Sequence, residues 1–256
     1  LGLRADEFER WQDISTKLRV PMHADGIISQ FEGYERLREF DWDDYRARYG
    51  NIQRLDLILE AEHDSPNRYK LSKQADLLML FYLFSADELR AIFTRLGYPF
   101  DHDTIPRNVA YYEDRTSHGS TLSRVVHAWV LARSNRRRAM GYFAEALLSD
   151  VRDIQQGTTA EGIHLGAMAG TVDLVSRVST GIEVTGDVLR FNPELPREIG
   201  RLDMRIRYRG HSLDLQLTRD TLTIRGRDGG RVPIRIGFRN DVYEFAAGST
   251  RVFPLG

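Results

Sequence analysis

The chain has 256 residues, of which 41% are hydrophobic and 29% are charged. This composition excludes a disordered chain, and the length is typical of one large folded domain or two ordinary ones. The 36 lysines and arginines balance the 37 aspartates and glutamates, so no charge excess points to nucleic acid or a membrane surface as a partner. Without cysteine the chain can form neither disulfides nor thiolate zinc sites. This fits a reducing compartment, and we expect a cytoplasmic protein.

The chain also carries no segment of a targeted or membrane-spanning protein. No stretch approaches the roughly 18 apolar residues of a membrane span, and the N-terminus has no signal-peptide pattern. The first residue is Leu1 instead of methionine. We therefore expect a fragment or a trimmed chain.

Helical hydrophobic stripes dominate the chain up to Gly181. The expected helices cover residues 6–18, 75–84, 86–96, 120–133 and 137–149, and a last helix starts near residue 162. Ser85 and Glu88 have the spacing of a capping box, and Gly97 ends that helix. Residues 23–49 are rich in aromatic residues and aspartate but lack this period, which favours long irregular connections with short helical turns.

After Gly181 apolar and polar residues alternate, as in residues 202–208 and 213–217. This alternation predicts an antiparallel sheet with one buried face and one face in water. Gly210 and Asp220 separate the expected strands. The fold class expected from the two periods is therefore α+β, with a helical part over residues 1–181 and an antiparallel β domain over residues 182–256.

Two segments rich in hydroxyl groups each precede an expected helix, residues 116–123 (TSHGSTLS) and 157–164 (GTTAEGIH). Hydroxyls and the free amides of a helix N-terminus together form a good anion site. From the residues alone, helix capping by Ser120 or Thr121 is the simpler explanation. A tight turn with a hydrogen-bonded His164 is the simpler explanation for the second segment.

Other candidate sites are weaker. Lys73 and Gln74 offer several donors for sugar hydroxyls at a helix start, although a solvated helix surface explains them more simply. The arginine run at residues 136–138 lacks interleaved aromatics and indicates a solvated face. The histidine and aspartate groups at residues 63–64 and 101–103 match no standard metal-site spacing. The sequence has no dinucleotide fingerprint or P-loop, so we expect neither a metal nor a cofactor.

Four segments occur here in one order, residues 30–34 (QFEGY), 73–76 (KQAD), 116–123 and 162–164 (GIH). In that order and rough spacing they resemble the second half of the catalytic barrel of glycoside hydrolase family 65. That family holds the inverting maltose, trehalose, kojibiose and nigerose phosphorylases and a few hydrolases. The resemblance implies a partial (α/α)6 helical barrel over residues 1–181, followed by a small antiparallel β-sheet domain over residues 182–256.

The resemblance also implies roles for five residues. Lys73 and Gln74 would hold the glucose at the cleaved end, and Ser120, Thr121 and His164 would bind phosphate. The family's general acid is a glutamate in a Gly-Pro-Asp-Glu-Tyr type motif, which this sequence lacks. We therefore expect no catalytic residue in this chain, and we expect the chain alone to be inactive. The partners implied are a disaccharide and inorganic phosphate, and the full-length protein is expected to be a homodimer.

The implied reaction is phosphorolysis of an α-linked glucose disaccharide of the trehalose or maltose type. It needs an acid and a phosphate nucleophile, and residues 116–123 carry no carboxylate that would repel phosphate. An α-glucoside hydrolase such as a trehalase would instead need a base carboxylate, for which Glu113, Asp114 and Glu161 are nearest in sequence. A phosphorylase predicts that Glu161 points away from His164. A non-catalytic module that binds sugar or a partner is the alternative outside enzymes.

Overall fold

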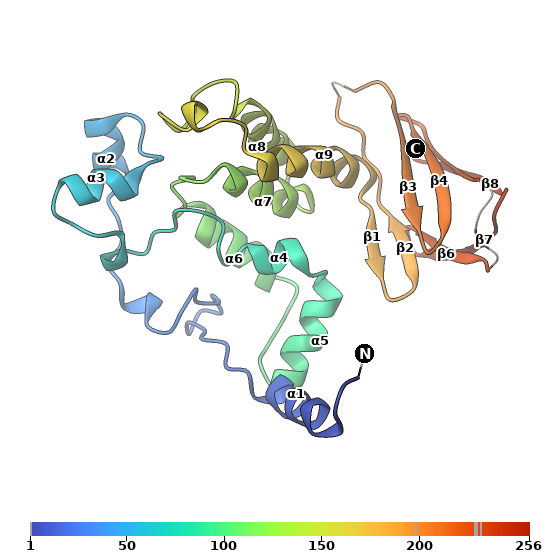
Figure 1. Cartoon of the computed structure of the whole chain (residues 1–256), viewed down its shortest axis with the longest axis horizontal. Helices are drawn as coiled ribbons and strands as arrows, with labels where there is room; N and C mark the ends of the chain where they lie inside the picture. Colours follow the sequence, from blue (N-terminus) through green and yellow to red (C-terminus); the bar gives the residue numbers. More distant parts are fainter. Residues whose placement is uncertain (1, 198, 228–229, 231) are drawn as a thin grey trace. The chain divides into compact units, whose positions relative to one another are not determined.

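The computed structural model describes residues 2–197, 199–227, 230 and 232–256. The chain forms two compact units, Leu1–Met168 and Ala169–Gly256 (Figure 1). The first unit is helical, and the second contains the strands. In the described ranges, no helix is both long enough and apolar enough to cross a membrane.

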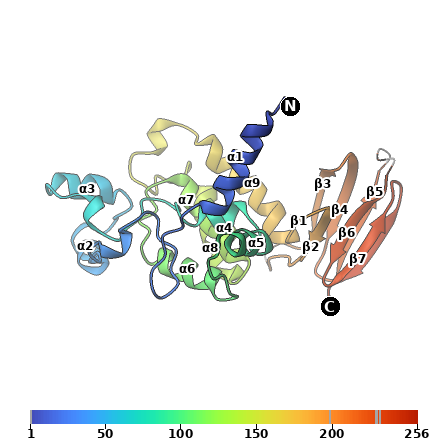
Figure 2. The same cartoon turned by 90° about the horizontal axis from the view of Figure 1, so that it is seen from below.

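The described residues hold nine α-helices, fewer than the twelve of a closed (α/α)6 barrel. Their bounds are α1 Ala5–Lys17, α2 Trp42–Tyr49, α3 Leu55–Ala61, α4 Met79–Leu83, α5 Ala86–Leu96, α6 Thr104–Glu113, α7 Thr121–Ala132, α8 Arg136–Leu148 and α9 Leu165–Thr180. Short 3-10 helices cover Tyr34–Arg36, Pro66–Arg68 and Thr159–Glu161. The views from two sides show α2 beside α3 and α7 beside α8 (Figure 2).

Local sequence signals explain most of these helices. The capping box of α5 is present, because Ser85 Oγ accepts the Glu88 amide and Glu88 Oε2 accepts the Ser85 amide. Gly97 ends α5 with a φ of 79°. The helix expected over residues 75–84 starts only at Met79, after a turn in which the Asp76 amide bonds the Gln74 carbonyl. Sequence reasoning missed α3 and α6; Pro106 lies in the first turn of α6, where proline is tolerated.

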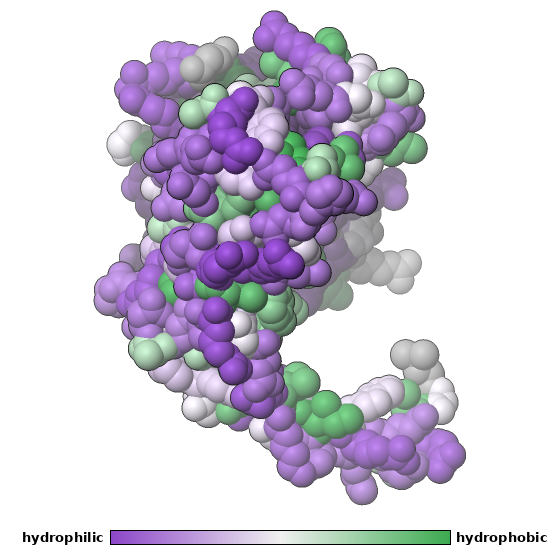
Figure 3. Space-filling view, turned by 90° about the vertical axis from the view of Figure 1, so that its left-hand side faces the viewer, coloured by the Kyte–Doolittle hydropathy of each residue, from purple (hydrophilic) through white to green (hydrophobic). Residues whose placement is uncertain are grey.

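Helix α1 contacts α5 and presents a partly exposed apolar face. None of its residues is buried, and Phe8, Trp11 and Ile14 are each more than half exposed. These residues recur at helical spacing, so they share one side of the helix. Scattered hydrophobic residues also appear on the mainly hydrophilic face drawn in Figure 3. The helical part thus exposes apolar side chains of α1 at helical spacing.

The second unit contains two four-stranded sheets, with strand orders β1-β2-β6-β7 and β3-β4-β5-β8. The strands are β1 Glu183–Thr185, β2 Val188–Phe191, β3 Leu202–Tyr208, β4 His211–Leu217, β5 Thr221–Gly226, β6 Ile234–Phe238, β7 Asp241–Phe245 and β8 Thr250–Pro254. The expectation of an all-antiparallel domain is wrong, because β2 and β6 pair in parallel, with Val188 opposite Arg235. Alternation predicts which face of a strand is buried, but it contains no information on strand direction.

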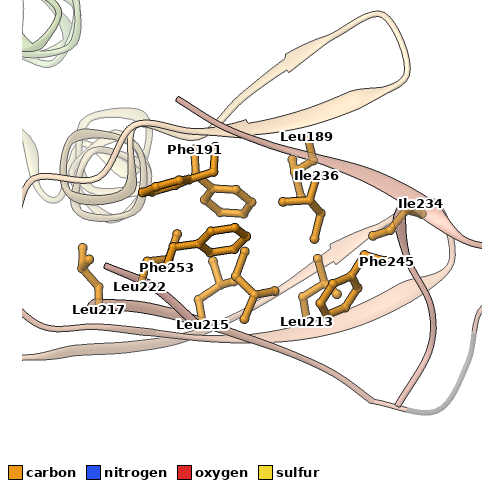
Figure 4. Packing of buried hydrophobic residues seen from close by; sticks show 12 residues of the cluster. Leu189, Phe191, Leu213, Leu215, Leu217, Leu222, Ile234, Ile236, Phe245 and Phe253 are labelled. Atoms are coloured by element: carbon orange, nitrogen blue, oxygen red, sulfur yellow. The ribbon is translucent and has the colours of Figure 1, made fainter. Parts of the chain in front are cut away.

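The core of the second unit lies between these two sheets. Alternate side chains of both sheets point inward and meet, as Figure 4 shows for Leu189, Phe191 and Ile236 opposite Leu213, Leu215 and Phe253. All of these side chains are at most 5% exposed. Both sheets therefore bury one face, as the alternation predicted, and they pack together as a sandwich of two sheets instead of one.

We predict that Ile236→Ala lowers the free energy of unfolding of this unit by about 2–5 kcal/mol, because it removes a fully buried side chain and leaves a cavity. Val252→Ala on the same sandwich is the control, since Val252 is 58% exposed and its truncation should cost less than about 0.5 kcal/mol. Chemical denaturation followed by circular dichroism measures both. Equal losses in the two variants would contradict the assignment of the core.

Candidate active site

Backbone hydrogen bonds join two of the segments that the sequence singled out. Ser72 forms a parallel bridge with Thr116, and the Ser117 amide donates to the Ser72 carbonyl at 2.9 Å. The Gly119 amide donates to the Lys73 carbonyl at 2.8 Å. Lys73 and the hydroxyl-rich loop therefore lie side by side, although more than forty residues separate them in the sequence.

Gly119 is required for this close approach. A Cβ atom at this position would lie 2.7 Å from the Gln53 carbonyl oxygen and 2.9 Å from Cγ of Lys73. Such distances are well inside normal contact, so any larger residue would push the loop away from Lys73. The glycine thus sets the spacing between the proposed sugar contact and the proposed anion loop.

The segment at residues 30–34 also contacts Ser72. The Gln30 side-chain amide donates to the Ser72 hydroxyl, and Tyr34 is fully buried. Tyr112, on α6, packs its ring 5.9 Å from that of Tyr34 and donates its hydroxyl to the Ile28 carbonyl at 2.6 Å. This segment therefore contacts the Ser72 side chain, whereas the loop contacts the Ser72 backbone.

Lys73 and Gln74 each face a carboxylate. Lys73 Nζ lies 2.8 Å from Asp56 Oδ2, and its side chain is half exposed. Burial of Asp56 acts to raise its pKa, but the hydrogen bond to Lys73, the charges of Lys73 and Arg54 and the Leu57 amide together outweigh burial and hold the pKa below its usual value. The Gln74 amide donates to Asp76 at 3.0 Å on the surface. Both side chains are accessible to a ligand, as a role in sugar binding requires.

The N-terminus of α7 offers hydroxyls to the same region. Ser120 occupies the N-cap position, yet its side chain accepts no hydrogen bond from the first turn of the helix. Thr121 follows as the first helical residue and is 6% exposed. Capping was the simpler explanation of Ser120, and the geometry removes that explanation.

The backbone conformation and ring packing of His118 help to fix this loop. It has a φ of 57°, which is unusual for a residue with a side chain, and its Nδ1 atom lies 3.0 Å from Ser123 Oγ. Its ring packs 4.6 Å from that of His127 and 5.1 Å from that of Tyr142. Burial, helped by nearby positive groups, lowers the pKa of His118 to about 2, and burial lowers that of His127 to about 4. Both imidazoles are therefore neutral parts of the scaffold at physiological pH.

His164 lies in the second hydroxyl-rich segment and is held by Asp150. Asp150 Oδ1 lies 2.7 Å from His164 Nδ1, and Asp150 Oδ2 accepts the His164 amide at 2.8 Å. On the other side of the ring, Glu161 Oε2 is 3.7 Å from Nε2. The expectation that Glu161 points away from His164 is wrong, because the carboxylate lies three residues before the ring in the sequence and comes within 3.7 Å of Nε2.

Direct contacts connect the second segment with the first. Gln155 is buried and donates its side-chain amide to the His118 carbonyl at 2.9 Å. A Cβ atom on Gly166 would lie 3.6 Å from the Leu122 side chain. Contacts thus link Lys73 to the loop before α7, and that loop to the segment of His164. Convergence of all five proposed residues on one cleft stays a prediction.

The cleft nearest to this loop has a volume of about 730 Å³, and its lining includes Thr116, His118, Glu113, Arg138 and Tyr142. None of the five residues proposed from the resemblance lines it. Burial raises the pKa of Glu113, and Arg138 Nε lies 2.7 Å from its carboxylate. This carboxylate is paired with Arg138, whereas Asp114, another of the carboxylates that a hydrolase could use, also lines the cleft.

Sequence reasoning did not single out Asp150 and Gln155. One signal was available for Asp150, because it lies two residues after the last residue of α8, where the negative end of the helix dipole disfavours a carboxylate. Nothing in the sequence marks Gln155, since a glutamine next to another glutamine in a polar loop is unremarkable.

We predict that the free energy of unfolding of the helical unit falls as the pH drops from 6.5 towards 5. In the unfolded chain the His127 imidazole has its ordinary pKa of 6.5 and binds a proton below that pH. In the folded state its pKa is lowered to about 4, so the ring stays neutral down to about pH 4. The free energy of unfolding therefore has its full value above pH 6.5. Below that pH, each of the two buried imidazoles lowers it by about 1.4 kcal/mol per pH unit. His127→Gln should flatten this slope in denaturation curves. His102→Gln, at an exposed histidine, should leave it unchanged.

Comparison with known proteins places these segments in a family. Residues 1–173 match the family model described as the glycosyl hydrolase family 65 central catalytic domain, and residues 182–244 match its C-terminal domain. A solved structure of a candidate kojibiose phosphorylase from the human microbiome has a TM-score of 0.73 at 20% identity, covering 99% of this chain and 31% of that one. This likeness supports the fold.

Curated relatives agree with the family models. An uncharacterized glycosyl hydrolase of Mycobacterium tuberculosis is 53% identical over 98% of this chain. The trehalose 6-phosphate phosphorylase of Lactococcus lactis is 33% identical over 84%, and a kojibiose phosphorylase of Caldanaerobacter subterraneus is 28% identical over 92%. The chain spans 19%, 28% and 29% of the lengths of these three relatives. The chain therefore belongs to glycoside hydrolase family 65, a family of enzymes.

Proposed function

We propose that this chain carries the glucose-binding and phosphate-binding part of an inverting phosphorylase that cleaves an α-linked glucose disaccharide of the trehalose or maltose type. Ser120 carries the proposal, because its hydroxyl stands at a helix N-terminus and makes no capping bond there. Membership of a family with phosphorylases among its relatives supports the same class of reaction.

The proposed site consists of two groups of residues, one for glucose and one for phosphate. Lys73 and Gln74 bind the glucose unit at the cleaved end. Ser120, Thr121 and His164 bind phosphate, together with the backbone amides that begin α7. Hydrogen bonds from neutral and cationic donors stabilise the anion without a nearby carboxylate in residues 116–123. Inorganic phosphate is then the co-substrate, and the reaction uses no cofactor.

The proposed reaction inverts the anomeric centre. A general acid protonates the leaving glycosidic oxygen, and phosphate attacks the anomeric carbon from the opposite face. We assign the acid to a part of the full-length enzyme outside these 256 residues. Residues 1–181 would then form the C-terminal half of an (α/α)6 barrel, and residues 182–256 the C-terminal β domain. The full-length enzyme is proposed to be a homodimer.

The deciding experiment measures sugar release by the full-length enzyme with phosphate varied at fixed disaccharide. We predict that His164→Ala and Ser120→Ala each raise the KM for phosphate by about 10- to 100-fold, since a hydrogen bond to a charged group contributes about 1.5–3 kcal/mol. The KM for the disaccharide should change little. His102→Ala, at an exposed histidine far along the chain, is the control. Sugar release that does not depend on phosphate would reject the proposal.

One observation favours an α-glucoside hydrolase as the second candidate. Glu161 lies 3.7 Å from His164 Nε2 and is 64% exposed, so a carboxylate stands where a water-activating base would be useful. In a phosphorylase the same charge repels the incoming anion. The two functions therefore predict opposite effects of removing it.

We predict that Glu161→Gln in the full-length enzyme lowers the KM for phosphate about two- to fivefold, because it removes one partly screened negative charge beside the anion. The maximal rate should stay within about twofold of the unaltered enzyme, since the residue takes no part in proposed proton transfer. A loss of more than about 100-fold in rate, with no phosphate dependence, would instead identify Glu161 as the base of a hydrolase.

A further inference from the structure

Asp150 contacts His164 in two places at once. One carboxylate oxygen accepts the ring Nδ1–H at 2.7 Å, and the other accepts the backbone amide of the same residue at 2.8 Å. A carboxylate can only accept hydrogen bonds, so the proton on this side of the ring must lie on Nδ1. This arrangement fixes the position of the residue and the tautomer of its side chain together.

Apart from these two hydrogen bonds, the surroundings of Asp150 disfavour a buried carboxylate. Its side chain is 6% exposed, and it lies two residues after the last residue of α8, where the helix dipole is negative. Among the residues that the structure describes, no lysine or arginine forms an ion pair with it. Burying a carboxylate without a cationic partner destabilises a protein. Its two bonds to His164 are therefore the interactions that offset this cost.

The opposite side of the ring is open to a ligand. With Nδ1 occupied, Nε2 is the remaining polar atom, and the side chain of His164 is 27% exposed. Glu161 approaches Nε2 only to 3.7 Å, which is longer than a hydrogen bond, and its own side chain is 64% exposed. An anion can therefore reach Nε2 once this surface carboxylate moves aside.

We propose that Asp150 is the positioning residue that sets the tautomer of His164 and presents its Nε2 atom to phosphate. This inference rests on the proposed function of the site. In the free site Nδ1 donates to Asp150 and Nε2 carries a lone pair. On binding, monoanionic phosphate transfers its proton to Nε2, so that the ring becomes an imidazolium that donates from Nδ1 to Asp150 and from Nε2 to an oxygen of the resulting phosphate dianion. The positive charge then lies between two negative groups, which makes the second bond a charge-assisted one. Asp150 itself touches no substrate.

The first test observes the tautomer directly in the 256-residue chain. Long-range ¹H–¹⁵N correlation spectra recorded at about pH 8, where an ordinary imidazole is neutral, report which ring nitrogen carries the proton. We expect Nδ1–H at His164 in the unaltered chain and a shift to Nε2–H in Asp150→Ala. Asp153→Asn is the matched control, because Asp153 bonds the amides of Gly157 and Thr159 in the same loop but does not touch the ring.

The second test uses phosphate kinetics in the full-length enzyme. We expect Asp150→Asn, which keeps the size of the side chain, to raise the KM for phosphate about tenfold, as loss of an orienting partner of a ligand-binding histidine does elsewhere. The rate at saturating phosphate and the KM for the disaccharide should be retained. A general folding defect would lower the rate as well, so the split between the two parameters separates positioning from a structural role.

The possible outcomes distinguish a failure of this inference from a failure of the proposed function. An unchanged Nδ1–H tautomer in Asp150→Ala overturns the inference, whatever the kinetics. A phosphate KM that rises in His164→Ala but not in Asp150→Asn also overturns it, and it leaves the proposed function standing. Sugar release that ignores phosphate in the unaltered enzyme overturns the proposed function itself, and with it the role assigned to Asp150.

Discussion

The close backbone contact between residues 72–73 and residues 116–119 is the constraint on which the candidate site depends. Two inter-segment hydrogen bonds, from Ser117 to Ser72 and from Gly119 to Lys73, fix the loop before it enters α7. Backbone bonds of this kind position side chains more firmly than contacts between flexible side chains. Because Lys73 belongs to one segment and Ser120 directly follows the other, the main chain sets the distance between the proposed glucose contact and the proposed phosphate contact.

A second layer of buried polar groups holds the loop in place, and it combines two neutral imidazoles with the buried guanidinium of Arg124, which donates to the His118 carbonyl. His118 and His127 pack against each other and against Tyr142, and burial keeps both imidazoles neutral. In the proposed site the neutral imidazoles only support the turn, and the positive character for phosphate would come from the helix N-terminus and from His164.

Much of this arrangement could be predicted from the sequence, for identifiable reasons. The capping box at Ser85 and the glycine at Gly97 specify the bounds of α5 locally, and the change of period near Gly181 separates helices from strands. The parallel pairing of β2 with β6 could not be predicted, since alternation is the same for both strand directions. Asp150 was missed because its role depends on a contact with His164 across a loop, which no local pattern records.

The parallel pair in the β-sandwich also affects how the second unit is assembled. The hairpin of β1 and β2 is complete early in the chain, but its parallel neighbour β6 follows only after β3, β4 and β5. Until β6 arrives, β2 presents an unpaired edge next to the apolar residues Leu189 and Phe191. Distant pairings of this kind slow folding, because loop closure precedes the contacts that repay it. During synthesis, this edge is the part of the unit most open to pairing with another chain.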